Sequence, residues 1–384
     1  MKKEVQGKRN VLKLGASSLF NDIGAEMITP ILPFFITSLG GGGLAVGVVS
    51  GLREGLSSLF KLIGGWASDK TGKRKEFILL GYIISIIARF LLFFSTSALY
   101  IVSLVGIERI GKMRDAPRDA IIADSVEKKG KWFGVHQFMD NFGGIIGIIL
   151  VVIMFGIFSL SYQTIILSAA ILSIFSLVPL FFVKTKKTKK EVFSIFAYLK
   201  HLDKNLKYFI FVSCVFTLAN FGLYMFLILR AKELTGSFVI PLVLYCLFHL
   251  VWAVFTIYFG ELSDKIGRKK VILIGYILFF LISAGFLYED GIFYLAFLFL
   301  GYGLVYAITQ SNQKAFVADL AKEHRGTALG FYYFVLGLVN IAAGIIAGIL
   351  WDITPTSMFI YLAVISFISI ILLCFVKEDI SKEN

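Results

Sequence analysis

The sequence predicts an all-α integral membrane protein, with twelve transmembrane helices in two pseudo-symmetric six-helix bundles and both termini in the cytoplasm. Three observations lead to this fold class: an apolar composition, a series of long apolar runs, and a repeat of the first half in the second. Of the 384 residues, 58% are hydrophobic and 16% are charged, and the mean hydropathy is +0.83. Soluble domains are about 45–50% apolar and about 25% charged. The composition therefore indicates a lipid bilayer as the solvent.

Each predicted span is a run of mostly apolar residues. About 20 such residues cross the roughly 30 Å hydrocarbon core as a helix. A closed barrel, the other structure that can span a bilayer, would need short alternating strands instead. In chain order, we predict helices at residues 11–38, 44–66, 76–96, 98–118, 131–157, 161–183, 205–229, 238–259, 270–287, 292–313, 326–350 and 354–376.

Basic residues set the orientation of these helices. Most of the 38 Lys and Arg lie in connections that share one side of the membrane, and this side is the cytoplasm if the N-terminus is inside. Examples are residues 73–75, 184–190 and 268–270. The net charge of +13 is thus explained by topology, and we expect no nucleic-acid partner.

Several function classes are excluded by what the sequence lacks. Cys214, Cys246 and Cys374 all lie in predicted spans and indicate no disulfide framework. No Gly-Lys pair precedes Ser or Thr, so no phosphate-binding P-loop is present, and no His-Glu-x-x-His metal motif occurs. We expect a protein that is not an enzyme and that holds no cofactor and no metal.

The two halves of the chain repeat each other. The stretch "GGWASDKTGKRKEF" returns as "YFGELSDKIGRKKVI", so that Asp69 and Asp264 stand 195 positions apart. Further on, "APRDAIIADSVEKKGKWFG" resembles "SNQKAFVADLAKEHRGTALG". We predict an N-terminal half at residues 1–183, a basic cytoplasmic linker at 184–204 and a C-terminal half at 205–384. Apolar residues at helical spacing in the linker favour an interfacial helix; a disordered linker is the alternative.

Both charged stretches fit the pattern G-x-x-x-D-K-x-G-[RK]-[RK]-K, at residues 65–75 and 260–270. This pattern resembles the loop signature of the major facilitator superfamily, between helices 2 and 3 and between helices 8 and 9. Ala67 stands where leucine is usual, and Lys70 and Lys265 stand where arginine is commoner. The resemblance covers most of the chain and implies the superfamily fold and a secondary transporter.

The resemblance also implies that this loop latches the two halves on the cytoplasmic side. A glycine in the turn tolerates a positive φ. The aspartate can face the positive N-terminus of a neighbouring helix, which for Asp69 would be the start of helix 11 near Gly326. The candidate gate residues are Gly65, Asp69, Gly72, Arg74, Gly260, Asp264, Gly267 and Arg268.

Ionisable groups inside spans are the second site signal. Each costs about 2.5–3.5 kcal/mol at mid-helix, so such groups are rare and usually functional. The second half has almost none beyond His249, whereas the first half is rich in them. The proton-coupling or substrate candidates are Asp22, Glu26, Arg53, Glu54, Arg89, Glu108, Arg109, His136 and Asp140.

Asp22 and Glu26 are the strongest coupling candidates. They lie one turn apart on one face of the first helix, and two carboxylates in a low dielectric resist ionising together, so one can hold a proton near neutral pH. Pro30 and Pro33 follow and predict a kink. The alternative is a static ion-pair network, in which arginines at 53, 89 and 109 neutralise these acids.

Two other candidates also have alternative interpretations. The planar fork of Arg109 suits an anionic substrate group, or it is a partner for the acids of the first helix. His136 has an ordinary pKa near neutrality, or it is a satisfied interfacial histidine. Gly143 and Gly147 follow at a spacing that permits close helix approach. Proton-coupled drug exporters of the superfamily carry a Gly-Pro in helix 5; Gly-Ile stands here, which argues against an antiporter.

These observations predict a secondary active transporter that moves a small organic solute across the cell membrane by alternating access, with protons as a possible coupling ion. The alternative is a non-transporting membrane receptor or accessory subunit with the same fold. We expect a multi-pass monomer of a prokaryotic cell membrane, and symport or antiport is left open.

Overall fold

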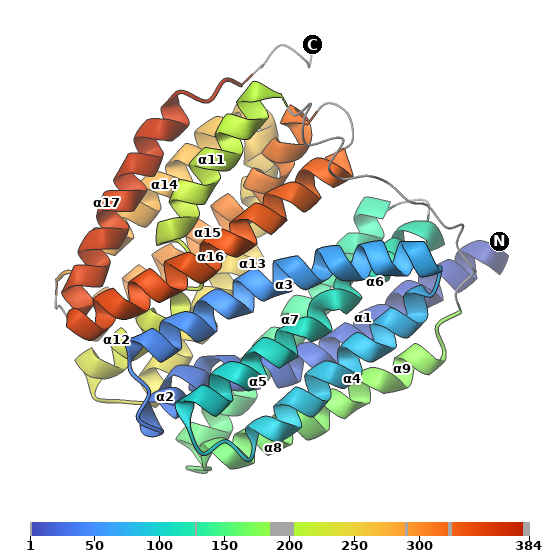
Figure 1. Cartoon of the computed structure of the whole chain (residues 1–384), viewed down its shortest axis with the longest axis horizontal. Coiled ribbons are helices and arrows are strands. Elements are labelled where there is room, and N and C mark those ends of the chain that lie inside the picture. The colour runs from blue at the N-terminus through green and yellow to red at the C-terminus, as the bar shows by residue number, and fades with distance from the viewer. Residues whose placement is uncertain (1, 127–128, 185–202, 289–290, 322–324, 379–384) are drawn as a thin grey trace. The chain divides into compact units, whose positions relative to one another are not determined.

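The computed structural model describes residues 2–126, 129–184, 203–288, 291–321 and 325–378, and every regular element in these ranges is a helix (Figure 1). The chain forms two compact units. The first comprises Met1–Gly41 and Leu56–Phe193, and the second comprises Gly42–Gly55 and Ser194–Asn384. The proposed interfacial helix of the linker lies almost wholly outside the described residues.

The helices of the first unit follow the predicted spans. In Figure 1 they run from blue to light green, and α1 packs against α6, α7 and α8 while α4 packs against α5 and α8. They are α1 (Lys2–Ile28), η1 (Thr29–Ile31), α2 (Leu32–Ser38), α3 (Gly43–Thr71), α4 (Arg74–Leu92), α5 (Ala98–Ile110), η2 (Gly111–Arg114), α6 (Asp115–Ser125), α7 (Lys129–Gly156), α8 (Tyr162–Ile174), η3 (Phe175–Leu177) and α9 (Val178–Phe181). The beginning of α3, up to Gly55, belongs to the second unit.

The second unit contains the remaining helices. In it α15 packs against α13 and α14, and α17 packs against α11 and α14 (Figure 1). They are α11 (Lys204–Ala219), α12 (Tyr224–Thr235), α13 (Val239–Ile266), α14 (Arg268–Gly285), α15 (Ile292–Leu320), α16 (Arg325–Ile353) and α17 (Pro355–Cys374).

Eight helical segments of the described chain are long and apolar enough to cross a membrane. They are Gln6–Ser38, Val135–Gly156, Tyr162–Phe181, Lys204–Thr235, Val239–Ile266, Ile292–Leu320, Ala328–Ile353 and Pro355–Cys374. The other four predicted spans also lie on helices, namely α3, α4, α5 with η2 and α6, and α14. These four are shorter or carry more charges, so hydropathy alone does not mark them.

The first helix of each unit is interrupted. Pro30 and Pro33 lack the N–H that an α-helix needs, and between Ile28 and Leu32 the chain adopts a 3₁₀ turn. The α-helix is therefore interrupted where the two prolines predict a kink. In the second unit the chain leaves the helix at Asn220, and α12 begins only at Tyr224. Irregular backbone at membrane depth is tolerated where it is buried in protein or lines a cavity.

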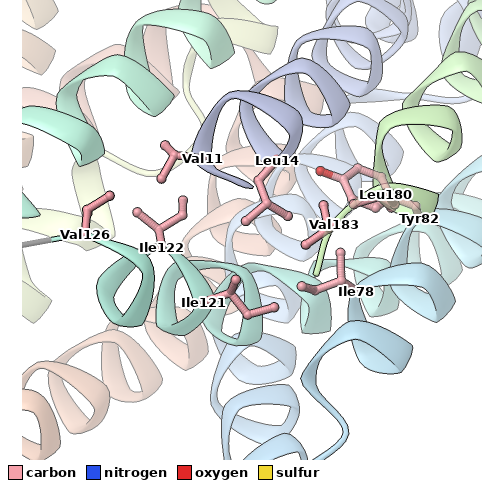
Figure 2. Packing of buried hydrophobic residues seen from close by; sticks show 9 residues of the cluster. All are labelled: Val11, Leu14, Ile78, Tyr82, Ile121, Ile122, Val126, Leu180 and Val183. Atoms are coloured by element: carbon pink, nitrogen blue, oxygen red, sulfur yellow. The ribbon is translucent and has the colours of Figure 1, made fainter. Parts of the chain in front are cut away.

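The apolar interior of the first unit is built from several helices at once. Figure 2 shows a cluster in which Val11 and Leu14 from α1 meet Ile78 and Tyr82 from α4. Residues of α6 and of the chain around α9 complete it. Many large apolar side chains lie on the outside instead, such as Ile257 at 72% exposed, as expected for a protein surrounded by lipid.

Glycines bring α1 and α7 close together, as the spacing of Gly143 and Gly147 predicts. A Cβ added to Gly143 would lie 2.5 Å from the carbonyl oxygen of Leu19 and 3.0 Å from its Cα. A Cβ added to Gly147 would collide with the backbone of Ile23. Because the two backbones are this close, the neighbouring side chains of α1 and α7 lie close to one another.

Candidate functional site

The buried charges of the first unit form three groups, and the first group is centred on Glu108. One carboxylate oxygen of Glu108 lies 2.9 Å from the Nη2 atom of Arg89, and the other lies 2.6 Å from Nη2 of Arg109. Arg89 also donates to the backbone oxygen of Asn21 at 3.0 Å and to the Ser173 hydroxyl at 2.7 Å. One carboxylate thus holds two buried guanidinium groups.

A second group of charges surrounds Asp115, at the start of α6. Its carboxylate lies 3.3 Å from Nζ of Lys61 and 3.6 Å from Nη1 of Arg118. Nζ of Lys112 and Nε of Arg114 each lie 3.9 Å from a carboxylate oxygen of Asp115. Four cations therefore face a single buried acid, and their charges favour its ionised form.

The third group joins α1, α4, α6 and α7 through the hydroxyl of Ser18. Arg118 donates to this hydroxyl at 2.9 Å, while the Tyr82 hydroxyl and Nε2 of His136 each lie 3.2 Å from it. On the other side of the imidazole, Nδ1 of His136 lies 3.4 Å from the carboxylate of Asp140. His136, Asp140 and the cation Arg118 are therefore brought together, as sequence spacing could not show.

Asp22 and Glu26 are half-buried on α1, one turn apart. Asp22 accepts a hydrogen bond from the Asn21 side chain at 2.8 Å, and Glu26 lies 3.5 Å from the Thr29 hydroxyl. In the described part of the chain, neither acid forms an ion pair with Arg89 or Arg109. The arginines at these two positions instead share Glu108.

Arg53 and Glu54 lie in the part of α3 that belongs to the second unit. Arg53 is buried and donates from Nε to the Tyr224 hydroxyl at 3.2 Å, at the first residue of α12. Ser50, one turn earlier on α3, donates to the carbonyl oxygen of Gly222. Residues that the sequence groups with the first half therefore support the interrupted helix of the second unit.

The first of the two repeated charged loops is organised by Arg74. Its guanidinium contacts Asp69 at 3.0 Å and Asp124 at 2.6 Å, and so joins the end of α3 to α6. Burial alone would lower the pKa of Arg74, but hydrogen bonds and charges from Asp124 and Asp69 outweigh it, and the pKa is raised. Gly72 has φ +72°, which confirms the predicted turn.

The second loop has the same arrangement. Arg268 contacts Asp264 at 2.9 Å and Asp319 at closer range, and Gly267 has φ +99°. Glu378, near the C-terminal end, accepts from the backbone N–H groups of Arg268 at 2.6 Å and Lys269 at 3.2 Å. The loop of each unit is therefore held by one arginine between two aspartates.

Asp124, Asp319 and Glu378 are the loop residues that the sequence analysis did not place in the site. The first two were visible as a signal, since Ala-Asp occurs at 123–124 and again at 318–319, 195 positions later. Glu378 had no such signal. Within the described residues, no cluster of three or more His, Cys, Asp or Glu is arranged to hold a metal ion.

A sequence model of the Major Facilitator Superfamily matches residues 14–338 and 238–384. The chain is 45% identical over 378 residues to the uncharacterized MFS-type transporter MJ1317 of Methanocaldococcus jannaschii, covering 96% of this chain and 95% of that protein. It is 24% identical over 380 residues to an uncharacterized Mycobacterium tuberculosis protein, Rv2265, covering 95% of this chain and 92% of the relative.

Solved structures show the same fold at lower sequence identity. A mutant of the nucleoside transporter NupG aligns with a TM-score of 0.80 at 17% identity, over 96% of this chain and all of the other. The peptide transporter POT in complex with sulfate aligns with a TM-score of 0.77 at 13% identity, over 96% of this chain and 93% of the other. At such identities the likeness concerns the fold alone.

Proposed function

Because the chain belongs to the major facilitator superfamily and is a secondary transporter, we propose that it carries a small organic solute across the cell membrane by alternating access, with protons as the coupling ion. It is a membrane protein, and we expect it to act as a monomer. Its substrate class is not specified by the fold.

One observation carries the proton-coupling part of the proposal: the buried ionisable side chains are concentrated in the first unit. Arg89, Glu108, Arg109, Asp115 and His136 are each at least nine-tenths buried. Such charges are costly in a membrane protein and usually mark substrate paths or proton relays. Asp22, Glu26 and Asp140 add three acids to the same region, and protonation of an acid there removes a charge from a balanced set.

The cytoplasmic loops support alternating access. A latch must hold one conformation and yet release it. Arg74 and Arg268 make ion pairs with partly exposed aspartates, whose side chains are 47–63% exposed. Exposed ion pairs contribute little to stability individually, so they can break and re-form during a transport cycle. The predicted contact of Asp69 near Gly326 remains part of this proposal.

A ligand screen followed by a flux assay tests the proposal. The purified protein is heated with organic cations, organic anions, nucleosides, sugars, peptides and amino acids, because a ligand at about 100 times its dissociation constant stabilises by about 2.7 kcal/mol. A stabilising ligand is then offered to proteoliposomes with and without a proton gradient. We expect gradient-driven accumulation.

Three other results would count against parts of the proposal. Ligand binding without flux would favour a receptor or accessory subunit. Flux that is independent of the gradient would remove proton coupling while leaving transport intact. Normal, unchanged pH dependence in Asp22→Asn and Glu26→Gln variants would exclude those two acids as the coupling groups.

A further inference from the structure

The four-helix contact around Ser18 has a counterpart in the second unit. Gln313 donates to the Tyr276 hydroxyl at 2.9 Å, and the Tyr332 hydroxyl donates to the side-chain oxygen of Gln313 at 3.2 Å. Ser213, on α11, lies beside both tyrosines. Side chains of α14, α15 and α16 therefore meet in one hydrogen-bonded contact, with the hydroxyl of Ser213 buried beside it and without a hydrogen-bond partner among the described residues. In the first unit, four residues of α1, α4, α6 and α7 meet in a similar contact.

The sequence repeat relates the two contacts position by position. Ser18 matches Ser213, and the stretch "APRDAIIAD" aligns Arg118 with Gln313, both 195 positions apart. The Gly-Tyr-Ile at 81–83 recurs at 275–277, and "GVHQF" at 134–138 aligns with "GFYYF" at 330–334. Tyr82 thus corresponds to Tyr276, and His136 to Tyr332.

The two copies differ in charge and in the side chain at their centre, which is Ser18 in the first unit and Gln313 in the second. Serine and tyrosine are kept, while the cation Arg118 is replaced by Gln313 and the titratable His136 by Tyr332. Asp140, one turn beyond His136, corresponds to Leu336. The second unit therefore shows that this fold can build the contact from neutral groups, so packing does not require the charges of the first unit.

We infer that the first-unit copy is the proton-binding site of the transporter, with His136 and Asp140 holding one exchangeable proton as a pair and Ser18, Tyr82 and Arg118 positioning it. This inference rests on the proposed proton-coupled function and names the site within it. The second-unit copy is its non-titrating counterpart.

The geometry gives the proton a defined place. Arg118 can only donate, so the Ser18 oxygen accepts from it. With the imidazole proton of His136 on Nδ1, which lies 3.4 Å from the Asp140 carboxylate, Nε2 accepts from Ser18, and the Tyr82 hydroxyl donates to Ser18. In the described part of the chain, Oδ1 of Asp140 is buried and has no hydrogen-bond partner. It is the oxygen that is open to an arriving proton, and the imidazole stays neutral.

Charges on α1, η2 and α6 of the first unit act on the pair. From α1 the carboxylate of Asp22 faces Asp140; from η2 and α6 the groups are Lys112, Asp115 and Arg118. Asp115 and Arg118 also act on His136. The remaining neighbour, α8 (Tyr162–Ile174), carries no charged side chain.

Proton exchange at the pair changes the electrostatic attraction between Asp140 and Arg118. When Asp140 is ionised, its negative charge attracts Arg118 towards α7; when Asp140 takes up a proton, that attraction ends. Arg118 is then held by Asp119 at 3.2 Å and Asp115 at 3.6 Å, both on its own helix. The proton thus alters one charged contact between α6 and α7, and the neutral Gln313 of the second unit has no such response.

The test makes the first-unit copy like the second. A triple variant, Arg118→Gln with His136→Tyr and Asp140→Leu, carries the residues that already form this contact in the second unit. Infrared difference spectra report protonation of a carboxylic acid directly. They are recorded on the ligand-free protein between about pH 5.5 and about pH 8, the range in which histidine titrates, as do carboxyl groups whose pKa is raised by burial. We expect the wild type to show such a carbonyl band and the triple variant to lose it.

Two further variants keep the result interpretable. Asp140→Asn removes the titrating oxygen with the least change of shape and should lose the same band, even if the triple variant folds poorly. Tyr332→Phe alters the second-unit copy and should leave the spectrum as in the wild type. A band that persists in Asp140→Asn overturns the assignment.

Flux assays separate this site from the proposed function. If wild-type flux depends on the proton gradient and the Asp140→Asn variant loses that dependence, the inference holds. If wild-type flux is gradient-driven and Asp140→Asn retains it, the site is wrong but the transporter is proton-coupled. If wild-type flux ignores the gradient, the coupling proposal itself fails, and an Asp140 band would then mark a proton that is not coupled to transport.

Discussion

Glu108 neutralises two guanidinium groups that would otherwise be buried without a counter-charge. Arg89 is 1% exposed, and Glu108 and Arg109 are each 7% exposed. Transferring a charge from water into the protein interior costs free energy. The attraction between oppositely charged groups offsets this cost only when their geometry is good. The short contacts of Glu108 to both arginines meet that condition, so the carboxylate is a structural requirement of the first unit.

We therefore predict that Glu108→Gln lowers the free energy of unfolding by about 3–5 kcal/mol, the cost of leaving buried charges uncompensated. Chemical denaturation of the protein in detergent measures it. Asp119→Asn is the matched control, because Asp119 also pairs with an arginine but its side chain is 47% exposed. Asp119→Asn should lower the free energy of unfolding by at most about 1 kcal/mol. Equal decreases in the two variants would contradict the explanation.

Gly72 gives a backbone prediction at the same scale. Its φ of +72° lies in the left-handed region, where a Cβ costs about 1–2 kcal/mol. Gly72→Ala should lower the free energy of unfolding by that amount. Gly260→Ala is the control, since its φ is ordinary and an added Cβ would have nothing within 4 Å. If Gly260→Ala were as destabilising, the backbone explanation would be wrong.

Two helices of the second unit meet at a seam of glycines. A Cβ added to Gly51 on α3 would lie 2.7 Å from the backbone oxygen of Asn340, and one added to Gly344 on α16 would lie 2.9 Å from the nitrogen of Gly51. Such contacts let backbones approach closely. They explain why the beginning of α3 is packed with the second unit, although it is sequential with the first.

Asp352 closes this seam at its end. Its carboxylate accepts from the backbone N–H of Gly43 at 2.5 Å and of Leu44 at 2.8 Å, so it caps α3 from the end of α16. We predict that Asp352→Ala lowers stability by about 0.5–2 kcal/mol, the usual value of an N-cap. Asp352→Asn should retain most of it, because asparagine is an equally favoured cap. Thermal unfolding curves that coincide for the two variants would exclude the capping role.

Lysines repeat a second kind of cap in both units. Lys75 donates to the carbonyl oxygens of Phe181 and Val183 at 3.2 and 2.9 Å, and Lys269 donates to those of Cys374 and Val376, both at 2.7 Å. The last carbonyls of a helix carry a partial negative charge and favour a cation. The start of α4 is thus fastened to the chain at the end of α9, and the start of α14 to the chain at the end of α17.

At the scale of the whole molecule, the repeat extends to the loop arginines but with a shift. Asp69 and Asp264 stand 195 positions apart, and so do Asp124 and Asp319, whereas Arg74 and Arg268 are separated by 194. The arginine that bridges the aspartates is therefore one residue nearer to the first aspartate in the second unit. The arrangement in space is the same because the long arginine side chain absorbs the difference.

We predict that Arg74→Lys and Arg268→Lys each reduce transport, by about tenfold, because a lysine cannot make the forked contact to two carboxylates. Ligand binding measured by thermal shift should be unchanged, since both loops lie outside the charged core. The measurement is initial flux into proteoliposomes. Lys73→Gln, beside Arg74 in the same loop, serves as a control for loss of charge alone, and a comparable loss of flux there would contradict the latch.

Much of the fold could be predicted because its signals are local. The apolar runs, the prolines at 30 and 33 and the glycine at 72 act on their own stretch of backbone, and each appears in the structure where the sequence indicates it. The candidate site was less predictable. Arg109 turns to Glu108, its neighbour in sequence, and Arg53 reaches Tyr224 on a helix more than 170 residues later. Those choices depend on which helices pack together.

The sequence by itself determined the solvent, the superfamily and the two charged loops, because hydropathy and short motifs depend only on residues close together in the chain. Only the tertiary structure decided which acid each buried arginine pairs with, that the beginning of α3 packs with the second unit, and that His136 meets Ser18, Tyr82 and Arg118. The physical reason is that ion pairs and hydrogen bonds form between helices. Their energies depend on distances of a few ångströms, which packing alone sets.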